Sequence, residues 1–97
     1  YLYYLILGRA HFALGELHQA RIHLERAMLR NPANLETRIY AATVHVTAGN
    51  KVEAAWEAEE IRAIQPNFSI KAWLATHPLR DRKTQAKLVR ACAELGL

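Results

Sequence analysis

Two stretches of the chain, YLILGRAHFALGELHQARIHLERAMLRNP at residues 4–32 and RIYAATVHVTAGNKVEAAWEAEEIRAIQP at residues 38–66, carry the same landmarks in the same order. Each landmark recurs at an offset of 34 residues. The four pairs are His11 with His45, Gly15 with Gly49, Ala20 with Ala54, and Pro32 with Pro66. Because glycine and proline each impose special backbone conformations, their joint recurrence predicts a repeated structural unit and not a coincidence in an alanine-rich chain.

Each repeated unit has the pattern of two helices joined by a short turn. Gly15 and Gly49 mark the turns, and Pro32 and Pro66 end the second helix of each unit, because proline disfavours helical geometry in its predecessor and has no amide to donate. Connections this short make neighbouring helices antiparallel. The expected helices span residues 2–14, 17–30, 35–48 and 52–64.

Residues 69–97 begin a third unit and then depart from it. Ser69 is a suitable N-cap for a short helix, which His77-Pro78 interrupts. A last helix is expected over residues 82–95, with Asp81 as its N-cap. Its apolar residues share one face and its basic residues lie along another. This profile is typical of a helix that caps the end of a solenoid.

The repeated units resemble the tetratricopeptide consensus, closely in the first unit and less closely in the second, where Arg38 replaces a bulky apolar residue. The matching residues are Tyr4, Leu7, Gly8, His11, Ala20, Leu24, Ala27 and Pro32, followed by Ala42, His45, Ala54 and Pro66. The small residues among them let helices approach closely, and the large ones fill the space between. The resemblance implies one all-α solenoid domain, with repeats over residues 1–34 and 35–68 and a partial repeat with a cap helix over 69–97.

The resemblance also implies a function, because such repeats bind other proteins or peptides along the concave face formed by the first helix of each unit. The residues expected to line this groove are Leu2, Leu5, Arg9, Phe12, Glu36, Ile39, Thr43, Val46 and Trp73. Their mixed apolar character suits an amphipathic helix or an extended apolar peptide. The lysine/asparagine clamp that chaperone-binding relatives use for a terminal carboxylate is absent.

The C-terminal residues 68–97 resemble the tail of bacterial class III adenylate/guanylate cyclases that carry tetratricopeptide repeats. This resemblance implies a signalling parent protein, although the metal- and nucleotide-binding residues of the cyclase catalytic domain have no counterparts in the chain. Similar tails end some bacterial transcription regulators, so such a regulator is the alternative parent. We expect the chain itself to be a scaffold and not an enzyme.

The net charge of +4 arises entirely in the C-terminal part of the chain. Residues 1–70 carry seven Lys/Arg and seven Asp/Glu, whereas residues 71–97 carry six and two. A basic helix face is one feature of nucleic-acid binding, but this face has no interleaved aromatic residues for base stacking. We therefore expect no nucleic-acid partner, with a nucleic-acid-contacting tail as the alternative.

No arrangement of residues predicts a catalytic, metal or cofactor site. His18 and His23 are five residues apart, off the spacing that puts two ligands on one helical face. Glu57, Glu59 and Glu60 are expected on a solvated face. The single cysteine, Cys92, cannot form an internal disulfide, which favours a reducing, cytoplasmic location. No apolar stretch approaches the roughly 20 residues of a membrane helix.

The first helix is apolar almost all round, and a helix of that kind is normally buried on more than one side. The chain also starts within this apolar segment, without an initiator methionine, which suggests a piece of a longer protein. We expect the uncovered part of the helix to support self-association, as a homodimer that buries Tyr1 to Leu5. Self-association is thus the alternative function to binding another protein.

Overall fold

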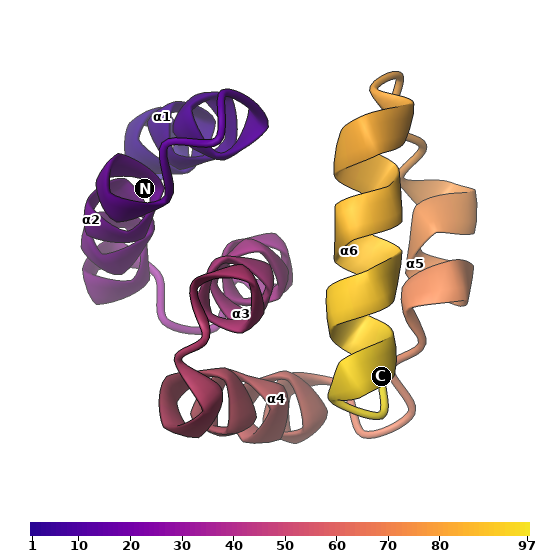
Figure 1. The fold of residues 1–97 in the computed structure, drawn as a ribbon. Helices are drawn as coiled ribbons and strands as arrows, with labels where there is room; N and C mark the ends of the chain where they lie inside the picture. Colours follow the sequence, from indigo (N-terminus) through magenta and orange to yellow (C-terminus); the bar gives the residue numbers. More distant parts are fainter.

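Six α-helices and no strand make up the fold of residues 1–97, all of which are described by a computed structural model (Figure 1). The helices are α1 (Leu2–Ala13), α2 (Leu17–Arg30), α3 (Leu35–Ala48), α4 (Lys51–Ile64), α5 (Ile70–Thr76) and α6 (Arg82–Glu94). The expected all-α class is confirmed, and every expected helix is present with ends that differ by no more than one residue. No helix combines the length and apolar composition that crossing a bilayer requires.

Two helical hairpins, α1 with α2 and α3 with α4, repeat the same turn at a spacing of 34 residues. Gly15 and Gly49 have φ angles of 78° and 81°, in the left-handed region that glycine adopts without strain. The amide after each glycine donates to the carbonyl of His11 or His45, at 2.9 and 2.8 Å. This hydrogen bond satisfies a carbonyl group left open by the helix end.

The two helices of the first hairpin approach closely at Gly8. A Cβ atom at this position would lie 2.8 Å from the side chain of Leu24, which is buried. Ala20 and Ala27, on the facing side of α2, are fully buried as well. Small residues at these positions therefore set the distance between α1 and α2.

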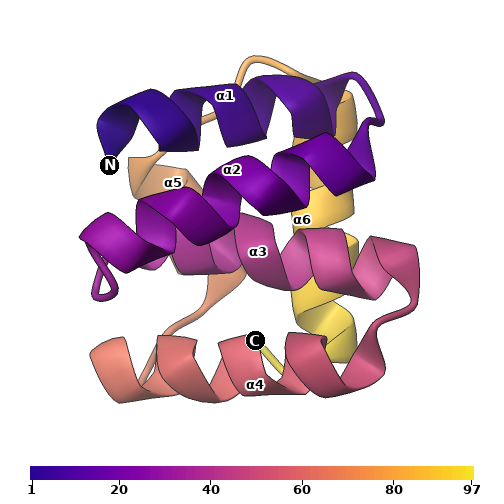
Figure 2. The ribbon, with the colours of Figure 1, turned by 90° about the vertical axis from the view of Figure 1, so that its left-hand side faces the viewer.

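The last helix crosses the face formed by the first helices of the two hairpins. Figure 1 shows α6 opposite α3, and Figure 2 shows it running steeply across α1 to α4 from behind. Leu88 and Cys92 are its fully buried residues, and α3 is its main partner. At its C-terminal end, Leu95 accepts a hydrogen bond from Arg62 of α4 at 2.6 Å.

The core therefore centres on α3, which packs against α1, α2, α4 and α6. Eight of its fourteen residues are buried, on nearly all sides of the helix. The remaining core comes from the facing sides of its neighbours. A solenoid core would be covered only by adjacent repeats, whereas this core is also closed by the C-terminal helix.

The expectation that all the concave-face residues line an open groove is wrong for five of them, Trp73 and the four residues named next. Leu5, Phe12, Ile39 and Thr43 are buried. Helix α6 packs against α3, and Lys87 of α6 lies over α1, with its Nζ 5.3 Å from the centre of the Phe12 ring. Sequence periodicity placed these residues on the correct side of their helices. It did not show that a segment of the same chain covers that side.

The expectation that Glu57 lies on a solvated face is also wrong. Arg38 of α3 donates to its carboxylate at 2.8 Å, and the two side chains are only 12% and 5% exposed. Arg38 donates in addition to the carbonyl of Pro32 at 3.1 Å. Arg38, which departs from the repeat pattern, is thus the partner of Glu57 in one interhelical ion pair. Glu59 is exposed and pairs with Arg62, as a surface residue would.

Candidate interaction surfaces

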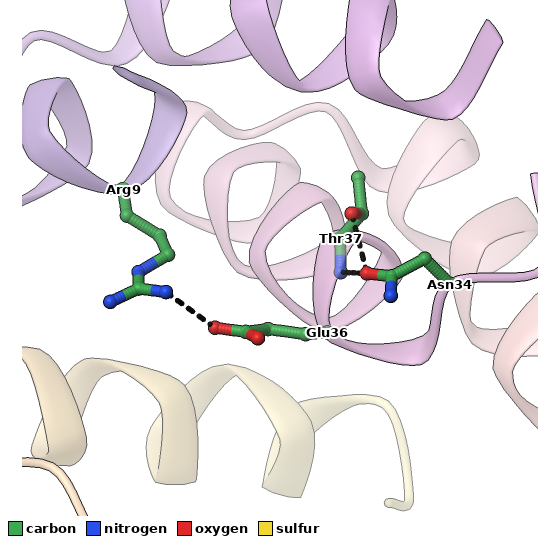
Figure 3. A network of polar contacts seen from close by, with 4 residues as sticks. All are labelled: Arg9, Asn34, Glu36 and Thr37. Atoms are coloured by element: carbon green, nitrogen blue, oxygen red, sulfur yellow. Dashed lines mark hydrogen bonds and ion pairs between the residues drawn. The ribbon is translucent and has the colours of Figure 1, made fainter. Parts of the chain in front are cut away.

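The polar members of the expected groove form an ion pair that joins the first helices of the two hairpins. Arg9 of α1 donates to the Glu36 carboxylate near the start of α3 at 3.0 Å (Figure 3). Beside them, the Asn34 side chain caps α3 by accepting from the Thr37 amide at 2.9 Å. Both members of the ion pair are partly exposed. The pair therefore bridges the surface between α1 and α3.

The other groove residues are separated from one another. Leu2 is exposed on α1, and Val46 is half-buried near the end of α3. Trp73 is buried in the core cluster, and its ring stacks on His77 with centroids 4.6 Å apart. The nine residues do not form one continuous groove in this structure.

The residues expected in repeat packing lie mostly at helix contacts. Gly8, Ala20, Leu24, Ala27, Ala42, His45 and Ala54 are buried, Tyr4, Leu7 and His11 are partly buried, and Pro32 and Pro66 are exposed in the turns. Tyr4 also lies under Arg30, whose guanidinium carbon is 4.6 Å from the ring centre.

One face of α1 exposes a continuous set of apolar side chains, here named the α1 face. Its members are Leu2, Tyr3, Ile6, Ala10 and Ala13, which recur at helical spacing. Leu2, Tyr3 and Ile6 are 58, 69 and 59% exposed. The expected surface over Tyr1 to Leu5 needs one correction, because Leu5 points into the core and Ile6 takes its place on the exposed side.

The α1 face continues into a cleft of about 510 Å³ between α1 and the segment that leads into α6. Ile6 and Ala10 form one wall, Leu79 and Arg80 lie opposite, and Tyr40 of α3 lines the cleft between them. Burial raises the pKa of the Tyr40 phenol. The phenol therefore stays protonated near neutral pH and serves as a neutral hydrogen-bonding group.

A second cleft, of about 870 Å³, shares Leu79 and Arg80 with the first and is named the Arg80 cleft. It is lined by Leu79, Arg80, Arg82, Gln85, Ala86, Val89 and Arg90. Sequence reasoning identified the basic character of this region but not its apolar floor. The spacing of Arg82, Ala86 and Val89 along one side of the last helix was the available signal.

Three of the five histidines, His11, His23 and His77, stack on other rings. His11 and His23 stack with ring centroids 5.2 Å apart, and His11 Nδ1 lies 2.9 Å from a Glu16 carboxylate oxygen. Burial, the neighbouring His11 and Arg26 lower the pKa of His23. A neutral His23 is consistent with its stacking position and with a buried Nδ1 that has no hydrogen-bond partner. No group of three or more His, Cys, Asp or Glu residues is arranged to hold a metal ion.

Cys92 is buried on the face of α6 that packs into the core. Burial raises the pKa of its thiol to about 12. Because the thiolate is the reactive form, this cysteine is chemically inert at neutral pH. It acts as a small apolar residue of the core.

Comparison of the chain with protein-family models, with curated proteins and with solved structures finds no match. The tetratricopeptide assignment and the cyclase parent therefore stay predictions made from the sequence. The surfaces described above are the basis on which function is argued.

Proposed function

We propose that this chain is a protein-interaction scaffold built from tetratricopeptide-type hairpins. Two observations support the hairpin type: the turns repeat the same glycine geometry and hydrogen bond at a spacing of 34 residues, and a small residue sets the close approach of the paired helices. A further observation supports a role in binding helices. The concave face accommodates an amphipathic helix, although here that helix is α6 of the same chain.

The observation that carries the proposal is the α1 face. Its large apolar side chains are more than half exposed although the rest of the chain has a well-packed core. Contiguous apolar surface of this kind marks binding sites in monomeric proteins, and tyrosine is enriched among residues that contribute most to binding. The adjoining cleft extends this face toward α6 and provides depth for an inserted side chain.

Selection of helical peptides from a random library tests the proposal directly. We expect amphipathic helical peptides to be selected, because they match a flat apolar helix face better than extended polar ones. Their binding should be lost in the Leu2→Glu/Ile6→Glu variant, since a charge at the centre of an apolar contact is left unpaired.

The matched control is Leu29→Glu/Val52→Glu, which places the same charges on exposed apolar residues of α2 and α4. Binding should be unchanged in this control. Failure to select any peptide that depends on Leu2 or Ile6 contradicts the proposal.

Self-association through the α1 face is the second candidate, and the same exposed side chains favour it. A two-fold dimer would place the α1 faces of two copies against each other and cover Leu2, Tyr3 and Ile6. Light scattering should then give a dimer mass at tens of micromolar, roughly the range in which weak interfaces associate. The Leu2→Glu/Ile6→Glu variant should be monomeric, whereas a wild-type protein that stays monomeric as its concentration rises removes this candidate.

A further inference from the structure

The short segment of Leu79 and Arg80 separates two clefts and contributes to both. The cleft of about 510 Å³ beside α1, here named the α1 cleft, and the Arg80 cleft share these two residues and are otherwise lined by different ones. The two clefts therefore form one path, which runs from the α1 face over this segment and along α6. Along α6 the path follows the side of the helix opposite to the buried residues Leu88 and Cys92.

The three arginines on this path form no ion pair within the chain. The five ion pairs of the structure involve other residues, so Arg80, Arg82 and Arg90 are all unpaired. Asp81, the acidic residue between the first two, is used as the N-cap of α6. It accepts hydrogen bonds from the Lys83 amide at 3.1 Å and the Thr84 hydroxyl at 2.6 Å. Three exposed guanidinium groups around one cleft create a local positive potential that favours a negatively charged ligand.

The floor between the arginines is apolar. Leu79 and Val89 are partly buried against the core cluster, and Ala86 lies between them on the exposed side of α6. Arginine side chains bind carboxylates in a planar, two-pronged geometry, while such a floor can accept an aliphatic side chain. A ligand that fits both features carries carboxylates with apolar side chains between them.

We propose that the Arg80 cleft binds an acidic segment of a partner protein, with its carboxylates on Arg80, Arg82 and Arg90 and its apolar side chains on Leu79, Ala86 and Val89. This inference rests on the proposed interaction function and names the chemistry of the partner and a second contact surface for it.

A nucleic acid would also be attracted by three arginines, but the cleft fits it less well. No aromatic side chain lines the Arg80 cleft, so bases have no surface on which to stack. An apolar floor contributes nothing to phosphate binding, whereas it matches the side chains of an acidic peptide. The acidic protein segment is therefore the ligand that the cleft favours.

Fluorescence anisotropy with short labelled peptides tests the proposal on the full chain. The probe contains glutamates separated by leucines, and the control probe has glutamine at each glutamate position. We expect the acidic probe to bind and the glutamine probe to bind roughly tenfold more weakly or not at all, since the charged hydrogen bonds are lost. Binding should also weaken as salt is added.

Two pairs of variants locate the site. Arg80→Glu/Arg90→Glu should abolish binding of the acidic probe, whereas Lys51→Glu/Lys71→Glu, which makes the same charge change at exposed, unpaired lysines elsewhere, should preserve most of it. Ala86→Glu should repel the probe, and Ala55→Glu, at an exposed alanine of α4 that does not line the cleft, should weaken it much less. Unchanged thermal unfolding of each variant shows that it folds.

Equal loss of binding in both double variants overturns the proposal, because it shows a response to net charge and not to the cleft. Tighter, Arg80-dependent binding of a DNA or RNA oligonucleotide also overturns it in favour of nucleic acid. The test is independent of the α1 face: the Leu2→Glu/Ile6→Glu variant should still bind the acidic probe. If that variant loses peptides selected on the α1 face but Arg80→Glu/Arg90→Glu does not affect the acidic probe, the scaffold function stands and this inference fails.

Discussion

Arg38 and Glu57 show how a single pair of charged residues joins two helices of this protein. The pair lies between α3 and α4, is almost fully screened from solvent and is supported by the bond from Arg38 to the Pro32 carbonyl. Such pairs contribute little net stability when compared with apolar residues of similar volume, because desolvating two charges is costly. Removing one partner has a different effect, since it leaves a buried charge uncompensated.

We therefore expect Glu57→Gln to lower the free energy of unfolding by about 3 kcal/mol. The double variant Arg38→Met/Glu57→Leu should recover most of this loss, because neither charge is then buried. Urea denaturation at neutral pH measures both. A single variant as stable as the double variant would show that water reaches the pair and screens it.

At the scale of single residues, the sequence identified Arg38 as unusual but missed its partner. The acidic run of Glu57, Glu59 and Glu60 predicts a surface position for Glu57. Its position three residues after Ala54 and four before Ile61 places it on the inward face of α4, and this spacing was available in the sequence. Helical position outweighs local charge in deciding which side chains are buried.

The ends of the helices follow closely from local chemistry. Glycine with positive φ ends α1, α3 and α6 at or near the predicted places, since these conformations depend on the residue itself. As predicted, Ser69 caps α5 and Asp81 caps α6. Each side chain accepts a hydrogen bond from a backbone amide of its helix. Local signals of this kind do not depend on the rest of the fold, so a single sequence is enough to find them.

The cap of α6 has a pH dependence with a definite sign. Hydrogen bonds from the Thr84 hydroxyl and the backbone hold the pKa of the Asp81 carboxyl below its ordinary value of 3.8. A lowered pKa in the folded state means that the contribution of Asp81 is fully present above its ordinary pKa and is lost as the pH falls through the lowered one. We expect Asp81→Asn, which keeps a capping side chain without the charge, to unfold with a shallower pH dependence in the acidic range. A thermal midpoint that falls with acid as steeply as in the wild type contradicts this role.

At the scale of the whole molecule, α6 converts a row of hairpins into a closed unit. It contacts α1 through Lys87 on Phe12, α3 along its buried face, and α4 through the bond from Arg62 to Leu95. The sequence predicts that the last helix is amphipathic, but it does not predict where this helix packs. Amphipathicity indicates which face of a helix is buried, whereas it does not identify the element that covers that face. This missing information is also why Phe12 and Thr43 were expected in an open groove.

Leu88→Ala tests whether the whole domain depends on α6. Leu88 is fully buried, so its truncation should lower the free energy of unfolding by about 3 kcal/mol. Amide hydrogen exchange should accelerate in α1 and α3 as well as in α6, since one cooperative unit opens together. The control Val52→Ala, at a largely exposed residue of α4, should change neither quantity. Acceleration confined to α6 would show that the hairpins are stable without it.

The position of α6 also affects how the chain can fold while it is being made. Ribosomes release the N-terminal hairpins first, and an ordinary repeat array can fold progressively because each unit contacts only its neighbours. Here the side of α3 that packs against α6 stays uncovered until α6 has emerged from the exit tunnel. During that interval the nascent chain presents an apolar surface that attracts chaperones, and its final folding step joins segments far apart in sequence, which slows it relative to hairpin formation.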